Sequence, residues 1–240
     1  MSSVLVVQHE DECPPVLLGR WLTEAGCTLE VCRPYAGDAL PDLTSYDGVL
    51  VLGGPQQAED DTVAWFGPLK EQLRAAHAAG VPTLGVCLGH QLVAAALGGR
   101  VERNPRGQQL GLIEVGWTAE AATDELVGPV ATPRRGVHWN DDVVTVLPEG
   151  ATVLAQTDAG EPQAVRFGPR SWGVQLHPEV DAATLRPWAE EDREAHVLRG
   201  IDQETLLRAV EDAADELTEA WRPLARSFAR IVGSSAGDAR

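Results

Sequence analysis

One cysteine stands where an apolar run meets a helical pattern. Residues 81–91 read VPTLGVCLGHQ, and Cys87 is flanked two positions away on each side by Gly85 and Gly89. A strand–turn–helix of the form G-x-C-x-G is typical of a nucleophile elbow, in which small neighbours leave room for a tight turn. Such a turn places the sulfur at the carboxyl end of a parallel strand, beside helix amides that favour a thiolate. The alternative is a helix start at which the cysteine packs by chance.

A thiol nucleophile needs a base and a group that orients the base. His177 ends an apolar strand pattern and is followed by Pro178 and Glu179. Residues i and i+2 of an extended chain face the same side, so the Glu179 carboxylate can reach the His177 ring and fix its tautomer. The alternative is a turn after a strand, without chemistry. Among the other histidines, we expect His77 and His196 at the surface.

Two further histidines lie near these motifs. His90 is too close along the elbow helix and is expected to point away from the sulfur, and His9 ends the first strand pattern without a supporting neighbour. Gly53 and Gly54 end the strand before the elbow strand, where glycine permits close approach of a ligand. The amides of Gly54 and Leu88 are therefore candidate donors to an oxyanion, the alternative being an ordinary turn.

The elements that position these residues follow an alternating pattern. Short apolar runs alternate with amphipathic stretches, which indicates an α/β fold with a mostly parallel central sheet and flanking helices. The later strands follow turn signals and favour an antiparallel or mixed extension of that sheet. The expected helices are residues 15–25, 62–79 and 89–97. The expected strands are residues 3–9, 29–34, 48–52, 82–86, 100–103, 110–116, 143–146, 152–156, 163–167 and 172–176.

The C-terminal part reads as a long helical pattern from about residue 202 to 231. Pro223 is expected to kink or divide it. Its apolar face either packs on its own domain or forms a dimer or partner interface. We expect one domain, with an α/β part over 1–198 and a helical extension over 199–240. The expected face consists of Val210, Ala214, Leu217, Trp221, Leu224, Phe228 and Ile231.

The composition excludes some classes of function. A net charge of −17, from 36 acidic and 19 basic residues, opposes binding to nucleic acid. No apolar stretch reaches a membrane-spanning length, and the N-terminus MSSVLVVQHEDE does not read as a signal peptide. We therefore expect a cytoplasmic protein without membrane or nucleic-acid partners. Cys13, Cys27 and Cys32 are expected to be inert thiols without disulfides.

Three motifs together resemble one family. LGGP at 52–55, GVCLGHQ at 85–91 and HPE at 177–179 are similar, in order and separation, to the motifs of the class I glutamine amidotransferases with a Cys-His-Glu triad. GVHWNDD at 136–142, followed by LPEGATVLAQT, resembles the free-standing, GMP-synthetase-like members. The resemblance covers about residues 4–180 and implies a flavodoxin-like fold. It implies no metal and no cofactor.

The resemblance also implies a role for each site residue. Cys87 would attack a side-chain carboxamide and form a γ-glutamyl thioester, with release of ammonia. His177 would deprotonate the thiol and then protonate the ammonia, and Glu179 would orient it. The amides of Gly54 and Leu88 would hold the oxyanion. The expected contacts to the small-molecule substrate are Gly53, Gln91 and the backbone near His138 and Trp139.

The chain also departs from the family pattern. Many relatives carry glutamate where this chain has Gln109, so a substrate contact at that position is not expected. No ATP-pyrophosphatase loop or P-loop follows, so the ammonia would pass to a separate synthetase subunit or be lost. The alternatives are a hydrolase of γ-glutamyl peptides or conjugates with the same triad, and a non-catalytic redox or regulatory module. A cysteine α/β-hydrolase is disfavoured, because such enzymes place the acid before the histidine on a separate loop, whereas Glu179 follows His177 by two residues.

Overall fold

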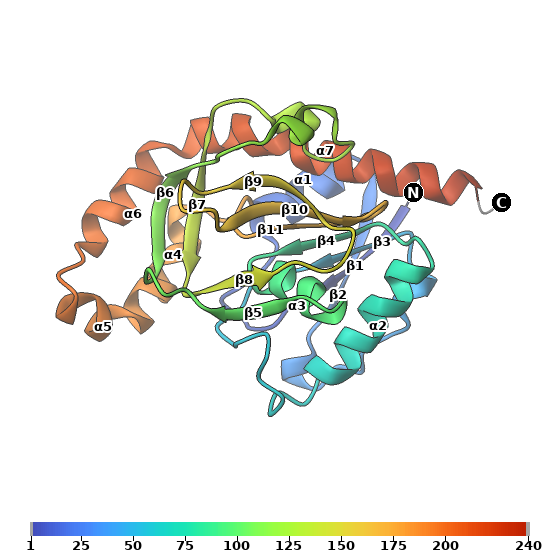
Figure 1. The fold of residues 1–240 in the computed structure, drawn as a ribbon, viewed down its shortest axis with the longest axis horizontal. Helices are drawn as coiled ribbons and strands as arrows, with labels where there is room; N and C mark the ends of the chain where they lie inside the picture. The colour runs from blue at the N-terminus through green and yellow to red at the C-terminus, as the bar shows by residue number, and fades with distance from the viewer. Residues whose placement is uncertain (1, 239–240) are drawn as a thin grey trace.

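A seven-stranded sheet forms the centre of the computed structural model, which describes residues 2–238, with side chains to residue 234 (Figure 1). Its order is β2-β1-β3-β4-β11-β10-β9, with parallel pairing from β2 to β11 and antiparallel pairing of β10 and β9. The predicted mostly parallel sheet with an antiparallel extension is confirmed. The strands are β1 (Ser2–Val7), β2 (Cys27–Cys32), β3 (Gly48–Val51), β4 (Thr83–Val86), β9 (Thr152–Gln156), β10 (Pro162–Gly168) and β11 (Ser171–Val174).

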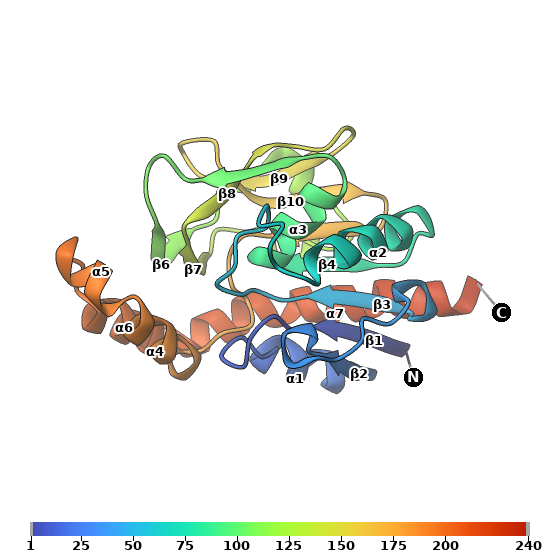
Figure 2. The same cartoon turned by 90° about the horizontal axis from the view of Figure 1, so that it is seen from below.

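Helices cover both faces of this sheet (Figure 2). In β1, Val4 and Val6 pack with α1 and α7 on one face, whereas Leu5 and Val7 pack with α2 and α3 on the other. The alternation follows from the two-residue period of a strand, and both faces are apolar because both are covered. The helices are α1 (Val16–Glu24), α2 (Phe66–Ala78), α3 (Leu88–Ala96), α4 (Ala182–Glu191), α5 (Arg193–Leu198), α6 (Gln203–Asp212) and α7 (Ala214–Asp238).

Four strands lie outside the central sheet, contrary to the expected single extension. They form two antiparallel pairs, β5–β8 and β6–β7. A strand in the middle of this sheet is buried on both faces, whereas β5 exposes Arg100, Glu102 and Arg103 and buries only Val101. The sequence pattern also does not predict β7 or α4. The bounds are β5 (Arg100–Arg103), β6 (Gln109–Glu114), β7 (Arg135–Asn140) and β8 (Asp142–Val146).

The C-terminal helical pattern divides at Ala213 rather than at Pro223, which lies inside α7. At the break Ala213 is buried and Ala214 is exposed, so Ala214 does not belong to the buried face. The rest of the expected face is buried in the core of the chain itself, where α7 packs on α1 and β1. That face is therefore used for packing within the chain. Its buried members are Val210, Leu217, Trp221, Leu224, Phe228 and Ile231.

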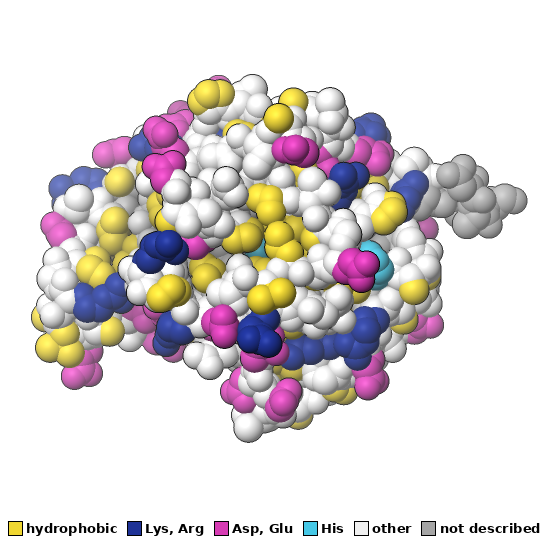
Figure 3. Space-filling model, in the orientation of Figure 1, with side chains coloured by type: hydrophobic (Ala, Val, Ile, Leu, Met, Phe, Trp, Pro, Cys, Tyr) yellow, Lys and Arg dark blue, Asp and Glu magenta, His cyan; other side chains and the backbone are white. Residues whose placement is uncertain are grey.

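The surface carries both signs of charge. On the face shown in Figure 3, acidic and basic side chains are interspersed around a central group of hydrophobic side chains. Within residues 2–238, no helix is long and apolar enough to cross a membrane. Figures 1 and 2 show α4, α5 and α6 as an arm at one end of the molecule, next to β6 and β7. This arm contributes one wall of the cavity described next.

Candidate active site

Cys87 occupies the turn between β4 and α3. Its backbone has φ 51° and ψ −109°, a conformation that side-chain-bearing residues rarely adopt. A Cβ on Gly89 would stand 2.0 Å from the carbonyl oxygen of Val51, and one on Gly85 would stand 2.5 Å from the Gly89 backbone. The turn therefore needs glycine at both positions. This is the elbow that the G-x-C-x-G spacing predicts.

His177 and Glu179 form a buried pair beside this turn. His177 Nδ1 lies 2.7 Å from Glu179 Oε1, and both side chains are almost fully enclosed. The His177 amide donates to the carbonyl of Val137 on β7 at 2.7 Å, and the Trp188 ring lies 4.9 Å from the imidazole, centroid to centroid. The contact between Glu179 and the ring, expected from the i, i+2 spacing, is confirmed.

The imidazole lies against the cysteine. A Cβ on Gly53 would stand 3.0 Å from His177 Cε1 and 3.6 Å from Cys87 Cβ, so the loop that follows β3 lies against both side chains. Burial lowers the pKa of His177, but the Cys87 sulfur and the Glu179 carboxylate outweigh it and raise this pKa to about 10. The imidazole is therefore protonated at neutral pH and carries its positive charge next to the sulfur. Because Glu179 occupies Nδ1, Nε2 is the nitrogen that can exchange a proton with the sulfur.

A cavity of about 250 Å³ opens above these residues. Of the residues predicted from sequence, it brings together Gly54, Cys87, Gln91, Trp139 and His177. It is also lined by residues that sequence reasoning did not single out for the site. These are Glu10, Cys13, Pro55, Gln56, Gln57, Arg103, Gln108, Asn140, Asp141, Asp142, Trp188, Glu191 and Asp192.

Other predicted residues lie outside this lining. His138 is fully buried, and its ring faces Asn140 and Gln163 rather than the cavity. On β7, Trp139 and Asn140 line the cavity, whereas His138 does not. Gly53, Leu88 and Glu179 lie behind the lining, next to residues that form it. The roles of all these residues in binding and catalysis stay predictions.

Gln109 and Cys13 differ in their position relative to the cavity. The Gln109 side chain accepts from Asn140 Nδ2 at 3.1 Å and donates to Glu161 at 3.1 Å, and it does not line the cavity. Cys13 does line the cavity, but burial, followed by the nearby Glu179, raises the pKa of its thiol well above the ordinary value. Cys13 is therefore a neutral, weakly reactive thiol beside Cys87.

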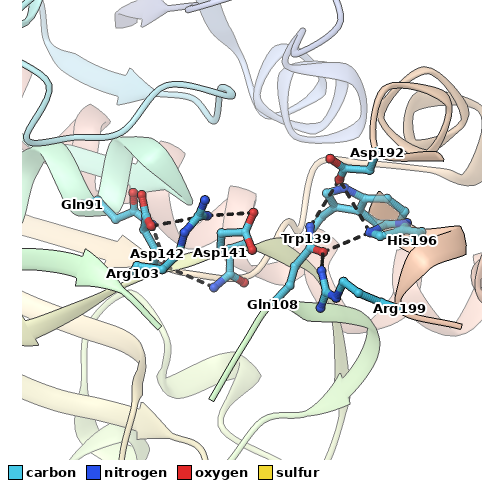
Figure 4. Close-up of polar contacts among 10 residues, drawn as sticks. Gln91, Arg103, Gln108, Trp139, Asp141, Asp142, Asp192, His196 and Arg199 are labelled. Carbon is cyan, nitrogen blue, oxygen red and sulfur yellow. Dashed lines mark hydrogen bonds and ion pairs between the residues drawn. The ribbon is translucent and has the colours of Figure 1, made fainter. Parts of the chain in front are cut away.

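Several charged side chains line the cavity. Arg103 is the basic residue in the lining; its Nη1 lies 2.9 Å from Asp141 Oδ2 and 3.7 Å from Asp142 Oδ1 (Figure 4). Glu10 and Glu191 lie on the same cavity, and burial, followed by repulsion from Glu191, raises the pKa of Glu10. Carboxylates and a guanidinium around one cavity suit a ligand that carries both an ammonium and a carboxylate.

The arm of helices closes one side of the cavity through a polar network (Figure 4). Asp192 accepts from Trp139 Nε1 at 2.9 Å and from Gln108 Nε2 at 3.2 Å. Gln108 Oε1 in turn lies 2.9 Å from His196 Nε2 and accepts from Arg199 at 2.7 Å. The expected surface position of His196 is wrong: its side chain is fully buried. The network depends on contacts between distant segments, which the local helical pattern does not reveal.

Gln175 is a second residue that sequence reasoning missed. Its side chain is 1% exposed and its Nε2 donates to Cys87 Sγ at 3.7 Å. A signal was available, because Gln175 directly follows β11 and precedes His177 by two residues, which places its side chain close to the elbow cysteine. The position of Gln175 at the end of the sheet does not by itself require a buried polar side chain next to a sulfur atom.

Comparison with known proteins agrees with this geometry. The model of the family described as "Glutamine amidotransferase class-I" matches residues 17–190, a range that contains the elbow and the histidine–glutamate pair. The glutamine amidotransferase-like protein YfeJ of Salmonella typhimurium is 32% identical over 67% of this chain and 68% of its own length. One subunit of the glutamine-hydrolyzing GMP synthase of Halobacterium salinarum is 39% identical over 56% of this chain and 67% of its own length.

Other relatives and solved structures extend the comparison. Gamma-glutamyl peptidase 5 of Arabidopsis thaliana is 28% identical over 78% of this chain and 74% of its own length. The crystal structure of a glutamine amidotransferase from Thermotoga maritima has a TM-score of 0.83 at 25% identity and covers 96% of this chain and 98% of its own. The family match spans most of the chain and includes Cys87, His177 and Glu179. The chain therefore belongs to the class I glutamine amidotransferase family and is an enzyme of this type.

Proposed function

We propose that the enzyme cleaves the side-chain amide of glutamine through a γ-glutamyl thioester on Cys87. The observation that carries this proposal is the strained elbow cysteine beside a buried histidine–glutamate pair at the floor of a small cavity. Nucleophilic catalysis by a thiol requires a cysteine, a base within reach and a group that holds the base. Cys87, His177 and Glu179 meet all three requirements.

In the first half-reaction, the Cys87 sulfur attacks the amide carbon and a tetrahedral oxyanion forms. The amides of Gly54 and Leu88 donate to this oxygen in our proposal, because both belong to segments that meet at the elbow. The C–N bond then breaks, His177 gives its proton to the leaving nitrogen, and ammonia departs. The thioester remains on Cys87.

In the second half-reaction, His177 accepts a proton from a water molecule, whose oxygen attacks the thioester carbon. The C–S bond breaks and the sulfur leaves with the electron pair, which restores the starting state and releases glutamate. Glu179 holds the ring through Nδ1 in both steps. We assign the α-amino and α-carboxylate ends of the substrate to the charged lining, with Arg103 as the partner of the carboxylate.

Gln91 and Trp139 complete the proposed substrate contacts, since both line the cavity. Gly53 and the backbone near His138 contribute by shaping its floor and wall. The destination of the ammonia is a separate proposal. Because two relatives are named as single subunits of a glutamine-hydrolyzing GMP synthase, we infer that a separate synthetase subunit receives it in this case also.

A second candidate is the hydrolysis of γ-glutamyl peptides by the same residues. It is favoured by the similarity to gamma-glutamyl peptidases 3 and 5, of which the latter covers 78% of this chain. The thioester step is unchanged, but the leaving group is then the amine of an amino acid. The charged lining of the cavity offers polar partners for such a group.

A hydrolysis screen separates these proposals. Purified protein is assayed for ammonia release from glutamine and for amine release from γ-glutamyl dipeptides, with and without candidate synthetase subunits, and Cys87→Ala serves as the blank. A higher kcat/KM on glutamine, raised further by a synthetase, supports the first proposal; a higher value on dipeptides supports the second. Equal rates for Cys87→Ala and the wild type on every substrate would contradict both.

A further inference from the structure

The side chain of Gln175 contacts the sulfur of Cys87 but does not line the cavity. It is 1% exposed and is absent from the cavity lining, so a substrate in the cavity does not touch it. Its backbone amide donates to the carbonyl of Gln163 on β10 at 2.8 Å, which fixes the chain at the end of β11. A buried amide side chain costs free energy unless its polar atoms are paired. The partners of this amide are therefore informative.

A chain of hydrogen bonds sets the direction in which this amide points. The carbonyl oxygen of Asp142 accepts from Gln91 Nε2 at 2.9 Å, and the same nitrogen donates to Gln175 Oε1 at 3.3 Å. A carbonyl oxygen can only accept, so it fixes the NH₂ end of Gln91. Gln91 in turn fixes the oxygen end of Gln175. The NH₂ end of Gln175 is left facing Cys87 Sγ at 3.7 Å.

An N–H group directed at sulfur favours the thiolate over the thiol, because hydrogen bonds to a charged acceptor are stronger than those to a neutral one. His177 lines the cavity, whereas Gln175 does not. The imidazolium loses its proton to the leaving nitrogen in each cycle. The Gln175 amide does not titrate and keeps the same polarity throughout.

We propose that Gln175 is a further catalytic residue, which stabilises the negative sulfur of Cys87 by a direct hydrogen bond. The proposal rests on the thioester mechanism given above, and it identifies two moments at which the amide acts. Before attack it favours the thiolate form of the free enzyme. During hydrolysis of the thioester, the C–S bond breaks and the sulfur leaves with the electron pair, and the same N–H group stabilises this leaving sulfur.

The test is the pH dependence of Cys87 alkylation by iodoacetamide, followed on the Cys87-containing peptide by mass spectrometry. Gln175→Met retains a side chain of similar size without the N–H donor, and Gln175→Glu replaces the amide by a carboxyl group. Loss of one hydrogen bond to a charged group is expected to raise the pH midpoint of alkylation by about one unit in Gln175→Met. A larger rise is expected in Gln175→Glu, because a carboxylate repels the thiolate.

Gln163→Met is the matched control. Gln163 is also a fully buried glutamine, but it bonds to the backbone of Gly116 and Glu114 rather than to sulfur. Its substitution should disturb packing without moving the alkylation midpoint. Gln91→Met tests the same chain of hydrogen bonds one residue further from the sulfur and should give a smaller rise. If the Gln175 variants do not fold, the alkylation midpoint of Gln91→Met is measured in their place.

The outcomes separate this inference from the proposed function. A raised midpoint in Gln175→Met and an unchanged one in Gln163→Met support the role of Gln175, even if the wild type hydrolyses no glutamine. The role is wrong if folded Gln175→Met has the wild-type midpoint, or if Gln163→Met shifts it equally. When the Gln175 variants are unfolded, a wild-type midpoint in Gln91→Met contradicts the role. Wild-type protein that is alkylated at Cys87 but inactive on every γ-glutamyl substrate contradicts the mechanism alone.

Discussion

At the scale of single residues, the reactive group is held in a conformation that costs free energy. Cys87 has a positive φ, and strained backbone of this kind persists only where the surroundings determine it. Here the surroundings are a hydrogen bond from the Cys87 amide to the carbonyl of Val174, at 2.8 Å, and the close packing of Gly85 and Gly89. The same packing aims the side chain at His177. Strain and reactivity therefore have a common cause.

The base and its orienting carboxylate make different contributions, which substitution can separate. His177→Ala removes proton transfer in both half-reactions and should lower kcat by about four orders of magnitude or more. Glu179→Gln keeps the ring but weakens its orientation and lowers its pKa, because the carboxylate is one cause of the raised value. A loss of about 10²- to 10⁴-fold in kcat is expected.

Steady-state ammonia release checks this order, and thermal unfolding confirms that each variant is folded. The redox alternative makes the opposite prediction. A regulatory module with an oxidisable Cys87 would keep its function in His177→Ala. Full activity in that variant would exclude the proposed base.

At the scale of elements, the elbow depends on the contact between α3 and the end of β3. Gly89→Ala places a methyl group 2.0 Å from the Val51 carbonyl oxygen, so α3 must move away from the sheet. We expect a loss of about 1–3 kcal/mol in the free energy of unfolding and a larger proportional loss of kcat, because the sulfur moves with α3. Urea unfolding and the glutaminase assay measure the two effects.

Gly67→Ala is the control for this substitution. Gly67 is exposed on α2, and a Cβ there meets no atom within 4 Å. Gly67 lies in the first turn of α2, directly before Pro68, so this variant should change the free energy of unfolding by less than about 1 kcal/mol and keep its activity. Equal activity of the Gly67→Ala and Gly89→Ala variants would show that the elbow does not need glycine at position 89.

Elements built from local patterns could be predicted from the sequence, and those built from distant contacts could not. The turn at Cys87 follows from Gly85 and Gly89, and the bond between His177 and Glu179 follows from their i, i+2 spacing. The pairing of β5 with β8 joins segments about forty residues apart, and no local signal specifies it. The burial of His196 likewise depends on Gln108, far away in the chain. The geometry of the elbow and of the histidine–glutamate pair was therefore predictable, whereas most of the cavity wall around them was not.

At the scale of the whole molecule, three buried histidines link stability to pH. Burial lowers the pKa of His9 and His90 to about 3, and burial outweighs the bond to Asn140 in lowering the pKa of His138 to about 4. An unfolded chain binds a proton at each ring near pH 6.5, whereas the folded chain does not. Stability is therefore lost progressively as the pH falls from 6.5 towards these values.

His177 has the opposite dependence. Its pKa is raised to about 10, so the stability that it contributes is fully present below pH 6.5 and is lost as the pH rises towards 10. The acid and alkaline losses have separate origins. Together they predict maximum stability close to neutral pH, well above the sequence pI of about 4.6.

His90→Leu tests the acid branch. Neither ring nitrogen of His90 has a hydrogen-bond partner among the described residues, and the ring packs on Phe167 at 5.3 Å between centroids. Each buried ring costs about 1.4 kcal/mol per pH unit below 6.5, or about 2 kcal/mol at pH 5. Leucine removes this cost at one site. The loss of unfolding free energy between pH 7 and pH 5 should therefore shrink by about 2 kcal/mol in His90→Leu.

Leu92→Ala, a fully buried position on the same helix, provides the comparison. Its cavity should lower the free energy of unfolding by about 2–5 kcal/mol at every pH without changing the slope. Urea unfolding at several pH values measures all three proteins. Parallel curves for His90→Leu and the wild type would mean that His90 takes up its proton in the folded state, so that the ring must have a polar partner in solution. A reduced slope in His90→Leu alone would show that part of the acid sensitivity of the fold arises from the buried, unprotonated ring of His90 on α3.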